Sequence, residues 1–197
     1  MDTIVYELDG NLYINLTNRC SNDCRFCVRN ENSSYYGYNL WLSKEPTVEE
    51  VLNAFPDKNY GEVVFCGYGE PTFRLKELIT IGKELKNRGY LVRLNTNGQG
   101  CLINGRDITE ELVDGIDEVN VSLNAGSREV YYDECRPVFG EDAYDALIDF
   151  AKKCKEHGIL TNFSIVDCIG EEEITKCKKI AEDAGIPLRI RKFIEKA

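Results

Sequence analysis

Three cysteines that lie close together in the sequence carry the clearest chemical signal. Cys20, Cys24 and Cys27 fall within eight residues, in the pattern C-x3-C-x2-C. Structural zinc sites normally use four ligands, and ferredoxin-type iron–sulfur clusters use four thiolates each. Three thiolates around one cluster leave one iron without a protein ligand. A catalytic zinc site likewise keeps one coordination position open. We therefore predict a cluster whose open iron binds another ligand. Three unrelated cysteines, or a zinc site with one distant ligand, are the alternatives.

An aromatic residue, Phe26, directly precedes the last of these cysteines. The pattern C-x3-C-x2-C with an aromatic residue at this place resembles the radical SAM superfamily. The resemblance implies that Cys20, Cys24 and Cys27 hold a [4Fe–4S] cluster, with Phe26 beside it. It also implies that the amino and carboxylate groups of S-adenosylmethionine (SAM) chelate the open iron. In that family, an electron from the cluster breaks a carbon–sulfur bond of SAM, and the released 5′-deoxyadenosyl radical abstracts hydrogen from a substrate.

A glycine-rich stretch, Cys66-Gly-Tyr-Gly-Glu-Pro-Thr72, follows the next apolar run of the chain. It resembles the glycine-rich motif of the same family, which ends in Gly-Glu-Pro. The resemblance assigns Gly69 and Glu70 to the methionine ammonium group of SAM, because glycines let backbone carbonyls come close and a carboxylate adds a charge-assisted hydrogen bond. Tyr68 departs from the family, which usually has glycine at this position.

Two further polar stretches, Asn95-Thr-Asn-Gly98 and Ser122-Leu-Asn124, follow the next two apolar runs. Similar residues of the family reach the ribose hydroxyls and the methionine carboxylate of SAM. The resemblance therefore implies cofactor contacts for Asn95, Asn97, Ser122 and Asn124. All of them fall at the carboxyl ends of predicted parallel strands, where such sheets bind ligands. For residues 95–98, an ordinary turn is the alternative.

Strand and helix patterns alternate along the chain and must position these motifs. The apolar runs 4–8 and 12–17, joined by Asp9-Gly10-Asn11, predict a hairpin. Further strands are expected at Val63–Phe65, Leu91–Leu94, Val119–Leu123, Phe163–Val166 and Leu188–Ile190. Helical stripes separate these runs, the first opened by the capping box Thr47-x-x-Glu50. From Leu12 onward this gives six strands and five helices, which predicts a parallel sheet with right-handed crossovers.

One face of these strands is polar. Asn120, Ser122 and Asn124 alternate with apolar residues, and the same alternation places Asn15, Arg93, Asn95, Arg189 and Arg191 on one face. A parallel strand buried on both faces reads as apolar throughout. We therefore predict an α/β fold in which the sheet curls around a polar cavity: a partial (β/α)6 TIM-like barrel with an N-terminal β-hairpin strand, as a single domain over residues 1–197. An open doubly wound sheet, or a sheet with one face in solvent, are the alternatives.

The composition restricts the partners and the location. The net charge is −10, from 34 acidic and 24 basic residues. An acidic chain gains nothing from releasing phosphate counterions, so we expect no nucleic-acid partner. No apolar run approaches the ~20 residues that cross a membrane, and the first residues lack the pattern of a secretory signal. We expect a cytoplasmic protein without a membrane partner, whose nine cysteines do not form a disulfide framework.

The remaining cysteines and an aromatic segment have open roles. Cys154 and Cys177 fall on apolar helical stripes and are expected in the core. Cys66 and Cys168 are expected at strand ends facing the cavity, and Cys101 and Cys135 in loops. A cavity thiol such as Cys135 or Cys168 could pass a hydrogen atom to a substrate radical, although ordinary packing is the simpler interpretation. Residues 31–46, rich in Tyr and Trp, form either a lid or a loop packed over the barrel mouth.

The arginines indicate the class of substrate and of electron donor. Arg93, Arg189 and Arg191 share the inward parity of their strands, and a buried guanidinium needs a partner anion. We expect a small anionic substrate. Arg25 and Arg29 flank the cluster loop of an otherwise acidic chain. Complementary charge speeds encounter, so we expect a flavodoxin or ferredoxin-type donor to dock there.

The resemblance extends over most of the chain and reaches one subgroup. Stretches such as NLYINLTNRC, EVVFCGYGEPT, RLNTNG and ECRPVFG resemble small radical SAM proteins associated with TatD-type metal-dependent hydrolases. A functional link to such a hydrolase is therefore expected. We predict a radical SAM enzyme acting on an unidentified substrate, with catalytic residues unknown. The alternatives are an activase that makes a glycyl radical in a partner protein, and a non-catalytic iron–sulfur carrier or sensor.

Overall fold

A seven-stranded β-sheet forms the centre of the protein. The computed structural model describes residues 2–30 and 34–193. The strands are β1 (Val5–Leu8), β2 (Asn11–Ile14), β3 (Val63–Phe65), β4 (Val92–Thr96), β5 (Glu118–Ser122), β6 (Leu160–Val166) and β7 (Leu188–Arg191). They lie side by side in chain order; β1 and β2 are antiparallel, and β2 to β7 are parallel. A doubly wound sheet reverses its strand order at one point, so the unreversed order confirms the predicted partial barrel.

The hairpin at the start forms where the sequence predicts it. Asp9 and Gly10 both have positive φ, at 51° and 80°, as a two-residue turn of type I′ requires. The turn sets the register that pairs Val5 with Ile14 and Leu8 with Asn11. The hairpin therefore adds β1 as an antiparallel edge strand beside the first parallel strand.

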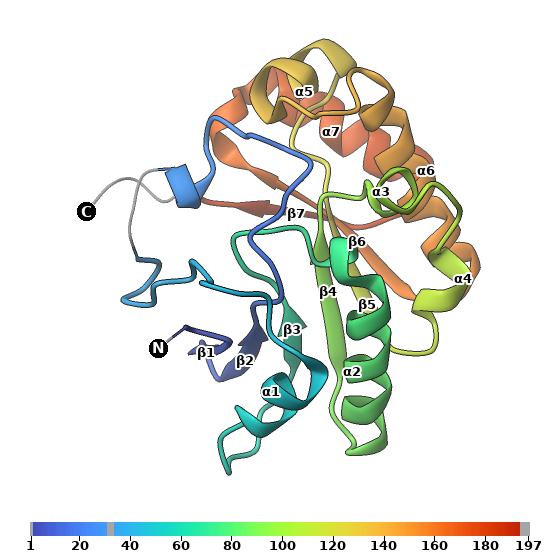
Figure 1. The fold of residues 1–197 in the computed structure, drawn as a ribbon. Helices are drawn as coiled ribbons and strands as arrows, with labels where there is room; N and C mark the ends of the chain where they lie inside the picture. The colour runs from blue at the N-terminus through green and yellow to red at the C-terminus, as the bar shows by residue number, and fades with distance from the viewer. Residues whose placement is uncertain (1, 31–33, 194–197) are drawn as a thin grey trace.

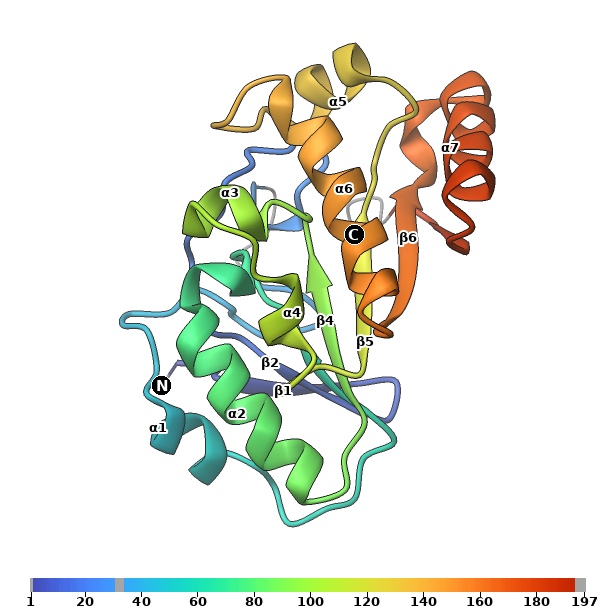
Figure 2. The same cartoon turned by 90° about the vertical axis from the view of Figure 1, so that its right-hand side faces the viewer.

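The helices lie along the outer face of the curved sheet (Figures 1 and 2). They are α1 (Val48–Asn53), α2 (Leu75–Asn87), α3 (Gly100–Asn104), α4 (Thr109–Leu112), α5 (Arg128–Cys135), α6 (Asp142–Glu156) and α7 (Glu171–Ala184). Short 3-10 turns cover Val28–Asn30, Pro71–Arg74 and Asp167–Ile169. The predicted capping box opens α1: Glu50 N donates to Thr47 Oγ1, and Thr47 N donates to the Glu50 carboxylate.

Two helical regions differ from the prediction. The crossover after β4 contains two short helices, because Gly105 ends α3 with a φ of 64°. The sequence also gives no apolar stripe for α5, which is an additional helix between β5 and α6. The expectation that Cys101 and Cys135 lie in loops is therefore wrong. Cys101 lies in α3, and Cys135 is the last residue of α5.

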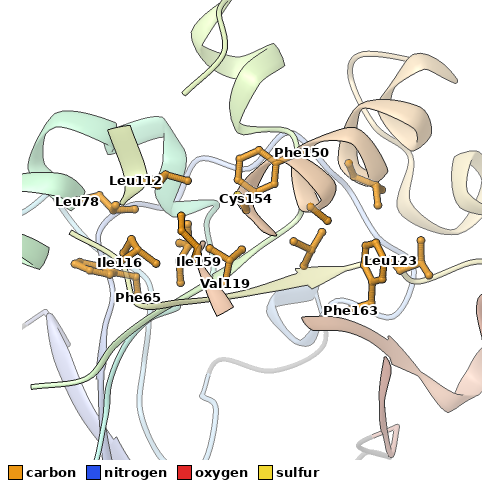
Figure 3. Close-up of a cluster of buried hydrophobic side chains, with 14 of the residues drawn as sticks. Phe65, Leu78, Leu112, Ile116, Val119, Leu123, Phe150, Cys154, Ile159 and Phe163 are labelled. Carbon is orange, nitrogen blue, oxygen red and sulfur yellow. The ribbon is translucent and has the colours of Figure 1, made fainter. Parts of the chain in front are cut away.

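The core lies between the helices and the outer face of the sheet (Figure 3). Phe65, Val119 and Phe163 of the strands are fully buried and pack with side chains of α2, α4 and α6, among them Leu78, Leu112, Phe150 and Cys154. Cys154 and Cys177 are fully buried in this core, as predicted. Fully burying a large apolar side chain contributes about 1.5–3 kcal/mol, so this layer holds the barrel wall in place.

The other face of the sheet is concave and polar. Register pairs Asn95 with Asn120, and Ser122 with Ser164, which in turn pairs with Arg189. Arg189 of β7 lies close enough to Glu62, directly before β3, to favour its ionised form. Four strand spacings separate β3 from β7, about 19 Å in a flat sheet. The sheet must therefore curl, and its polar face lines the inside of the curve.

Residues 34–46 pack against the hairpin and the glycine-rich turn. The backbones of Tyr35 and Tyr38 are hydrogen bonded to each other, and the Tyr38 ring lies 5.5 Å from that of Tyr6. Trp41 contacts Tyr68 with ring centroids 5.2 Å apart, and Leu42 is buried. Of the two predicted possibilities, the described part of this segment corresponds to a packed loop. Residues 31–33 lie outside the described residues.

Candidate cluster and cofactor site

The cluster loop, residues 20–27, leaves the sheet shortly after β2 and reaches the end of α5 (Figure 1). The thiols of Cys20, Cys24 and Cys27 are half-buried. Cys24 lies close enough to the other two for their charges to interact. Cys24 also lies close enough to Cys135 for the two side chains to interact. No three Cys, His, Asp or Glu side chains of residues 2–30 and 34–193 are gathered tightly enough to chelate a single metal ion.

The protonation of the three thiols depends on burial and on one cation. Burial raises the pKa of Cys20 to about 12 and also raises the pKa of Cys27. The hydrogen bond with Cys135, followed by burial, raises the pKa of Cys24. The guanidinium of Arg29 acts in the opposite direction on all three. Since a thiol binds metal as the thiolate, Arg29 favours the form that a cluster needs.

Arg29 is held against this loop instead of projecting toward a partner. Its side chain is 14% exposed, it donates a 3.0 Å hydrogen bond to the Asn22 carbonyl, and it lies 3.7 Å from the Asp23 carboxylate. Arg25 is 50% exposed and pairs with Glu134 at 3.5 Å. The prediction that both arginines offer a docking charge is therefore wrong for Arg29, because its guanidinium is used inside the loop.

Backbone hydrogen bonds fasten the cluster loop to α5. Asp23 N donates to the Cys135 carbonyl at 3.0 Å, and Arg25 N donates to the Glu134 carbonyl at 2.9 Å. The last carbonyls of a helix have no partner within the helix, so the loop satisfies two of them. On the other side, Val138 N donates to the Ser21 carbonyl at 2.9 Å. The position of the cysteines thus depends on a helix more than 100 residues away in sequence.

A buried polar network lies beneath the loop. The Tyr131 hydroxyl accepts hydrogen bonds from Gln99 Nε2 at 2.9 Å and from Asn22 Nδ2 at 3.2 Å. Gln99 Nε2 also donates to Asn22 Oδ1 at 2.7 Å. All three side chains are at most 5% exposed. Sequence reasoning missed this network. The one local signal was that Gln99 directly follows the predicted Asn95–Gly98 motif.

The glycine-rich turn packs directly on the cluster loop. Glu70 N donates a 2.7 Å hydrogen bond to the Arg19 carbonyl. A Cβ atom on Gly69 would lie 2.2 Å from the Thr17 carbonyl oxygen, and one on Gly67 would lie 2.1 Å from Asn15 Oδ1. Glycine is therefore required here for the close approach of two chain segments. The predicted approach of a ligand to the same backbone is not tested by these contacts.

Glu70 is a fully buried carboxylate with several donors. Its Oε1 accepts from Thr72 N at 3.1 Å, Thr72 Oγ1 at 2.8 Å and Thr96 Oγ1 at 2.8 Å, and its Oε2 accepts from Asn97 N at 2.7 Å. Burial raises the pKa of Glu70, and the hydrogen bonds from Asn97 and Thr72 oppose this shift. A carboxylate oxygen has two lone pairs, so Oε2 keeps one acceptor position for a further donor.

The other predicted cofactor residues fall into two groups. Asn97 lies beside the cluster loop. Its Nδ2 donates to Ser21 Oγ at 2.8 Å and lies 3.9 Å from Cys20 Sγ. Phe26 is half-buried and packs against the main core. Asn95, Ser122 and Asn124 lie at the carboxyl ends of β4 and β5, where Asn95 Oδ1 accepts from Asn120 Nδ2 at 3.4 Å. The structure thus brings all of them around one end of the sheet.

Three of the buried polar atoms that have no partner among the described residues lie on β5 and β6 or just after β5. They are Asn120 Oδ1, Asn124 Oδ1 and Ser164 Oγ. Asn120 and Ser164 share the concave face, and Asn124 stands at the end of β5 in a left-handed conformation with φ 58°. Because buried polar groups are nearly always hydrogen bonded, these atoms fit a polar ligand that supplies the missing partners. Sequence reasoning did not select Ser164, although its pairing with Ser122 follows from the alternation of polar residues.

The three inward arginines differ in their surroundings. Arg93 is buried and pairs with Glu62 at 2.8 Å. Arg189 and Arg191 are exposed on β7, which lies at the edge of the sheet. Arg189 pairs in register with Ser164 of β6, and Arg191 pairs with Val166. Since Ser164 lies on the concave face, both arginines have the parity of that face, as the sequence predicts, at the edge of the sheet.

Comparison with known proteins identifies the fold and the cluster motif together. Residues 14–184 match the family model described as "Radical SAM superfamily". The chain belongs to the radical SAM superfamily. The match spans the cluster loop, the glycine-rich turn, all of β3 to β6 and the last residue of β2. The predicted family, the [4Fe–4S] and SAM cofactors and the assignment to an enzyme family are confirmed by this match.

The curated relatives of this radical SAM chain share one name. Proteins of Saccharolobus islandicus (strain M.14.25 / Kamchatka #1) and Pyrococcus horikoshii, both named "Probable GTP 3',8-cyclase", are 35% and 25% identical to it over 182 residues. These matches cover 89% and 91% of this chain but 54% of each relative. The chain therefore spans about half the length of the curated relatives it matches. The predicted TatD-associated subgroup finds no support in these matches.

Solved structures agree on the fold. The structure of Streptococcus suis SuiB bound to the precursor peptide SuiA is 19% identical, with a TM-score of 0.72, and the match covers 97% of this chain and 41% of that one. SuiB bound to S-adenosylmethionine gives a TM-score of 0.69 at 17% identity, covering 95% and 41%. At these identities the likeness supports the architecture alone. No helix within residues 2–30 and 34–193 is long and apolar enough to cross a membrane.

Proposed function

We propose that this chain is a radical SAM enzyme whose [4Fe–4S] cluster is held by Cys20, Cys24 and Cys27. The observation that carries the proposal is the contact between the glycine-rich turn and the residue directly before the cluster loop, where Glu70 N donates to the Arg19 carbonyl at 2.7 Å. This contact joins the loop with three thiols to the turn with the acceptor Oε2. A reduced cluster with an open iron, when bound, supplies the electron that cleaves SAM into methionine and a 5′-deoxyadenosyl radical.

The chain's own residues bind and orient the cofactor. Arg29 favours the thiolate form of the three cysteines, and Phe26 covers the loop from the core side. Oε2 of Glu70 and the carbonyls around Gly69 accept hydrogen bonds from the ammonium group of SAM. Asn95, Asn97, Ser122 and Asn124 supply the remaining polar contacts at the strand ends. Support comes from the unpartnered Asn124 Oδ1, which is a buried acceptor awaiting a donor.

We further propose that the substrate is a small anion bound at the open edge of the concave face. Arg189 and Arg191 are exposed there, and a guanidinium grips carboxylate or phosphate through two parallel hydrogen bonds. The relatives named GTP 3',8-cyclase make GTP a suitable first test molecule. An activase for a glycyl-radical protein, or a carrier without catalysis, remain the competing functions.

The proposed cluster ligands are tested by single alanine substitutions. Cys20→Ala, Cys24→Ala and Cys27→Ala are each expected to abolish the brown absorbance and 5′-deoxyadenosine formation after anaerobic reconstitution. Cys66→Ala, Cys154→Ala and Cys177→Ala are the matched controls and are expected to keep both. Full cluster content in the Cys24 variant would refute the assignment. A cluster that never yields 5′-deoxyadenosine upon reduction would favour the carrier.

The anion site is tested with Arg191→Ala, using Arg88→Ala as a control on the exposed end of α2. Arg191→Ala is expected to leave SAM cleavage in the absence of substrate unchanged. It is expected to remove the stimulation of cleavage by GTP, or to raise the GTP concentration needed for it. If GTP stimulates neither wild type nor variants, a panel of phosphorylated and carboxylated metabolites replaces it. Equal stimulation of wild type and Arg191→Ala by an active anion would contradict the site.

An electron donor is proposed to dock beside the cluster loop. Arg25, Tyr132, Asp133, Arg136 and Pro137 line a surface hollow of about 350 Å³. Arg25 and Arg136 are about half exposed and add local positive charge to an acidic chain. We expect Arg25→Glu to slow reduction by flavodoxin but not by dithionite, because complementary charge speeds encounter. Arg106→Glu, an exposed arginine of the α3–α4 connection, is the control.

The single-domain organisation over residues 1–197, the cytoplasmic location and the link to a TatD-type hydrolase stay predictions. Limited proteolysis tests the first, because one domain should be cleaved only near its ends and in exposed loops.

A further inference from the structure

A fourth cysteine, Cys135, lies against one of the proposed cluster ligands. Cys135 ends α5, and its side chain lies close enough to the Cys24 thiol for the two to interact. Backbone hydrogen bonds on both sides of Cys24 hold this arrangement: Asp23 N donates to the Cys135 carbonyl and Arg25 N to the Glu134 carbonyl, at 3.0 and 2.9 Å. The residues before and after Cys24 are thus both bonded to the end of α5, which keeps Cys24 beside Cys135.

The two thiols differ in their access to solvent. Cys24 is half-buried, whereas Cys135 is fully buried, and its sulfur accepts a hydrogen bond from Asn124 Nδ2 at 3.8 Å. An oxidant in solution therefore reaches Cys24 first. A disulfide needs Cβ atoms about 3.5–4.5 Å apart, and the backbone bonds on both sides of Cys24 bring it to the end of the helix that carries Cys135.

We propose that Cys24 and Cys135 form a reversible disulfide in protein that has lost its cluster. Hydrogen peroxide oxidises the Cys24 thiol to a sulfenic acid and releases one water. The Cys135 sulfur then attacks the Cys24 sulfur, the S–O bond breaks, and a second water leaves with the Cys135 proton. Two thiols and one peroxide thus give one disulfide and two waters, and a dithiol reductant restores both thiols.

This disulfide would block cluster assembly and protect Cys24 during oxidation. A disulfide-bonded Cys24 cannot bind iron, so cluster assembly stops until the bond is reduced. The same bond keeps Cys24 from reaching the sulfinic and sulfonic acids, which a dithiol does not repair. Cys135 is then the resolving thiol that preserves a cluster site. This inference rests on the proposed role of Cys24 as a ligand.

The experiment compares cluster-free full-length wild type with Cys135→Ser and the control Cys154→Ser. Cys154 is equally buried, and it lies in α6 instead of beside the cluster loop. Each protein is treated with hydrogen peroxide and digested without reduction, and its peptides are analysed by mass spectrometry. Wild type and Cys154→Ser are expected to yield a linked pair of the peptides containing Cys24 and Cys135, lighter by two hydrogen atoms than the separate peptides.

The second measurement is how much cluster each protein regains after reduction. After treatment with dithiothreitol and reconstitution, wild type and Cys154→Ser are expected to regain most of their cluster absorbance. Cys135→Ser is expected to regain several-fold less and to carry sulfinic or sulfonic acid at Cys24. Circular dichroism checks that the variant folds, and the wild-type peptide map decides the disulfide independently of it.

Two results would overturn the proposal. One is a wild-type map with no Cys24–Cys135 link, including one that joins Cys24 to Cys20 or Cys27 instead. The other is equal recovery of cluster by Cys135→Ser and wild type. Untreated, reduced wild type that binds no cluster at all would contradict the proposed function, while the peptide map would still decide the disulfide.

Discussion

The main-chain N–H of Asn97 donates a 2.7 Å hydrogen bond to the carboxylate of Glu70. This bond ties the end of β4 to the glycine-rich turn after β3, and the same Asn97 reaches Ser21 of the cluster loop at 2.8 Å. Glu70 therefore connects three segments that are expected to surround the cofactor. Its structural role can be measured separately from any contact with SAM.

Glu70→Gln is expected to destabilise the cluster-free protein by about 1.5–3 kcal/mol. The amide nitrogen of glutamine would face a donor at either oxygen position, because both oxygens of Glu70 accept hydrogen bonds. Urea unfolding measures the change. The control is Glu84→Gln, an exposed carboxylate paired with Arg88 on α2, for which we expect at most about 0.5 kcal/mol. Equal effects of the two substitutions would show that the buried bonds of Glu70 contribute little.

Gly69→Ala is expected to separate the glycine-rich turn from the cluster loop. The added Cβ would lie 2.2 Å from the Thr17 carbonyl oxygen and 2.6 Å from that of Arg19, so backbone has to shift. We expect a loss of about 1–3 kcal/mol in stability and reduced cluster content after reconstitution. Gly61→Ala is the control, since its Cβ meets only Asn11 Oδ1 at an ordinary 3.5 Å. Normal cluster content in Gly69→Ala would contradict the requirement for close packing.

Tyr131→Phe tests the buried network below the cysteines. Removing the hydroxyl leaves Asn22 Nδ2 and Gln99 Nε2 without one acceptor, which should cost about 1–3 kcal/mol. Tyr132→Phe, at the exposed neighbouring position, should be nearly neutral. Unfolding in urea compares the two variants. We also expect Tyr131→Phe to lose its reconstituted cluster faster in the presence of a chelator, and an unchanged rate would show that the network does not support the loop.

Asp107→Asn tests the pH dependence of a helix start. Hydrogen bonds from Thr109 N at 3.0 Å and Thr109 Oγ1 at 2.7 Å, together with Lys153, hold the pKa of Asp107 well below its usual range. A carboxyl group whose folded pKa is lowered stabilises the fold above its unfolded pKa, near 3.8, and this contribution is lost as the pH falls through the folded pKa.

The expected result is a difference between wild type and Asp107→Asn that shrinks with acid. Asparagine keeps one side-chain oxygen for the Thr109 N–H but carries no charge, so we expect a loss of at most about 1 kcal/mol at neutral pH. Urea unfolding from about pH 7 down to about pH 2 should show a difference that starts to shrink near the unfolded pKa, 3.8, and keeps shrinking toward the lower folded pKa. Asp149→Asn is the control, because Asp149 also pairs with Lys153 but lies in the middle of α6, away from a helix start. A constant difference at every pH would contradict the role of the charge.

Several features could be predicted from the sequence because they depend on neighbouring residues. The spacing of Cys20, Cys24 and Cys27 limits how three thiolates can surround one group. The Asp9-Gly10 pair tolerates the positive φ angles that its turn needs. The alternation of polar residues placed Arg189 on the inner face, since side chains change sides at every residue of a strand. Each of these predictions depends only on residues that are close together in the sequence.

The tertiary structure decided what these groups contact. Charge alone predicted that Arg25 and Arg29 both offer a docking charge, but the fold holds Arg29 against Asn22 and leaves Arg25 half exposed. Cys24 and Cys135 lie close together although they are 111 residues apart in the sequence. Cys135 lies in α5, which has no apolar stripe from which a helix could be predicted. Such contacts depend on how far the sheet curls and where each crossover returns. Both follow from packing of the whole core, which no short stretch of sequence specifies.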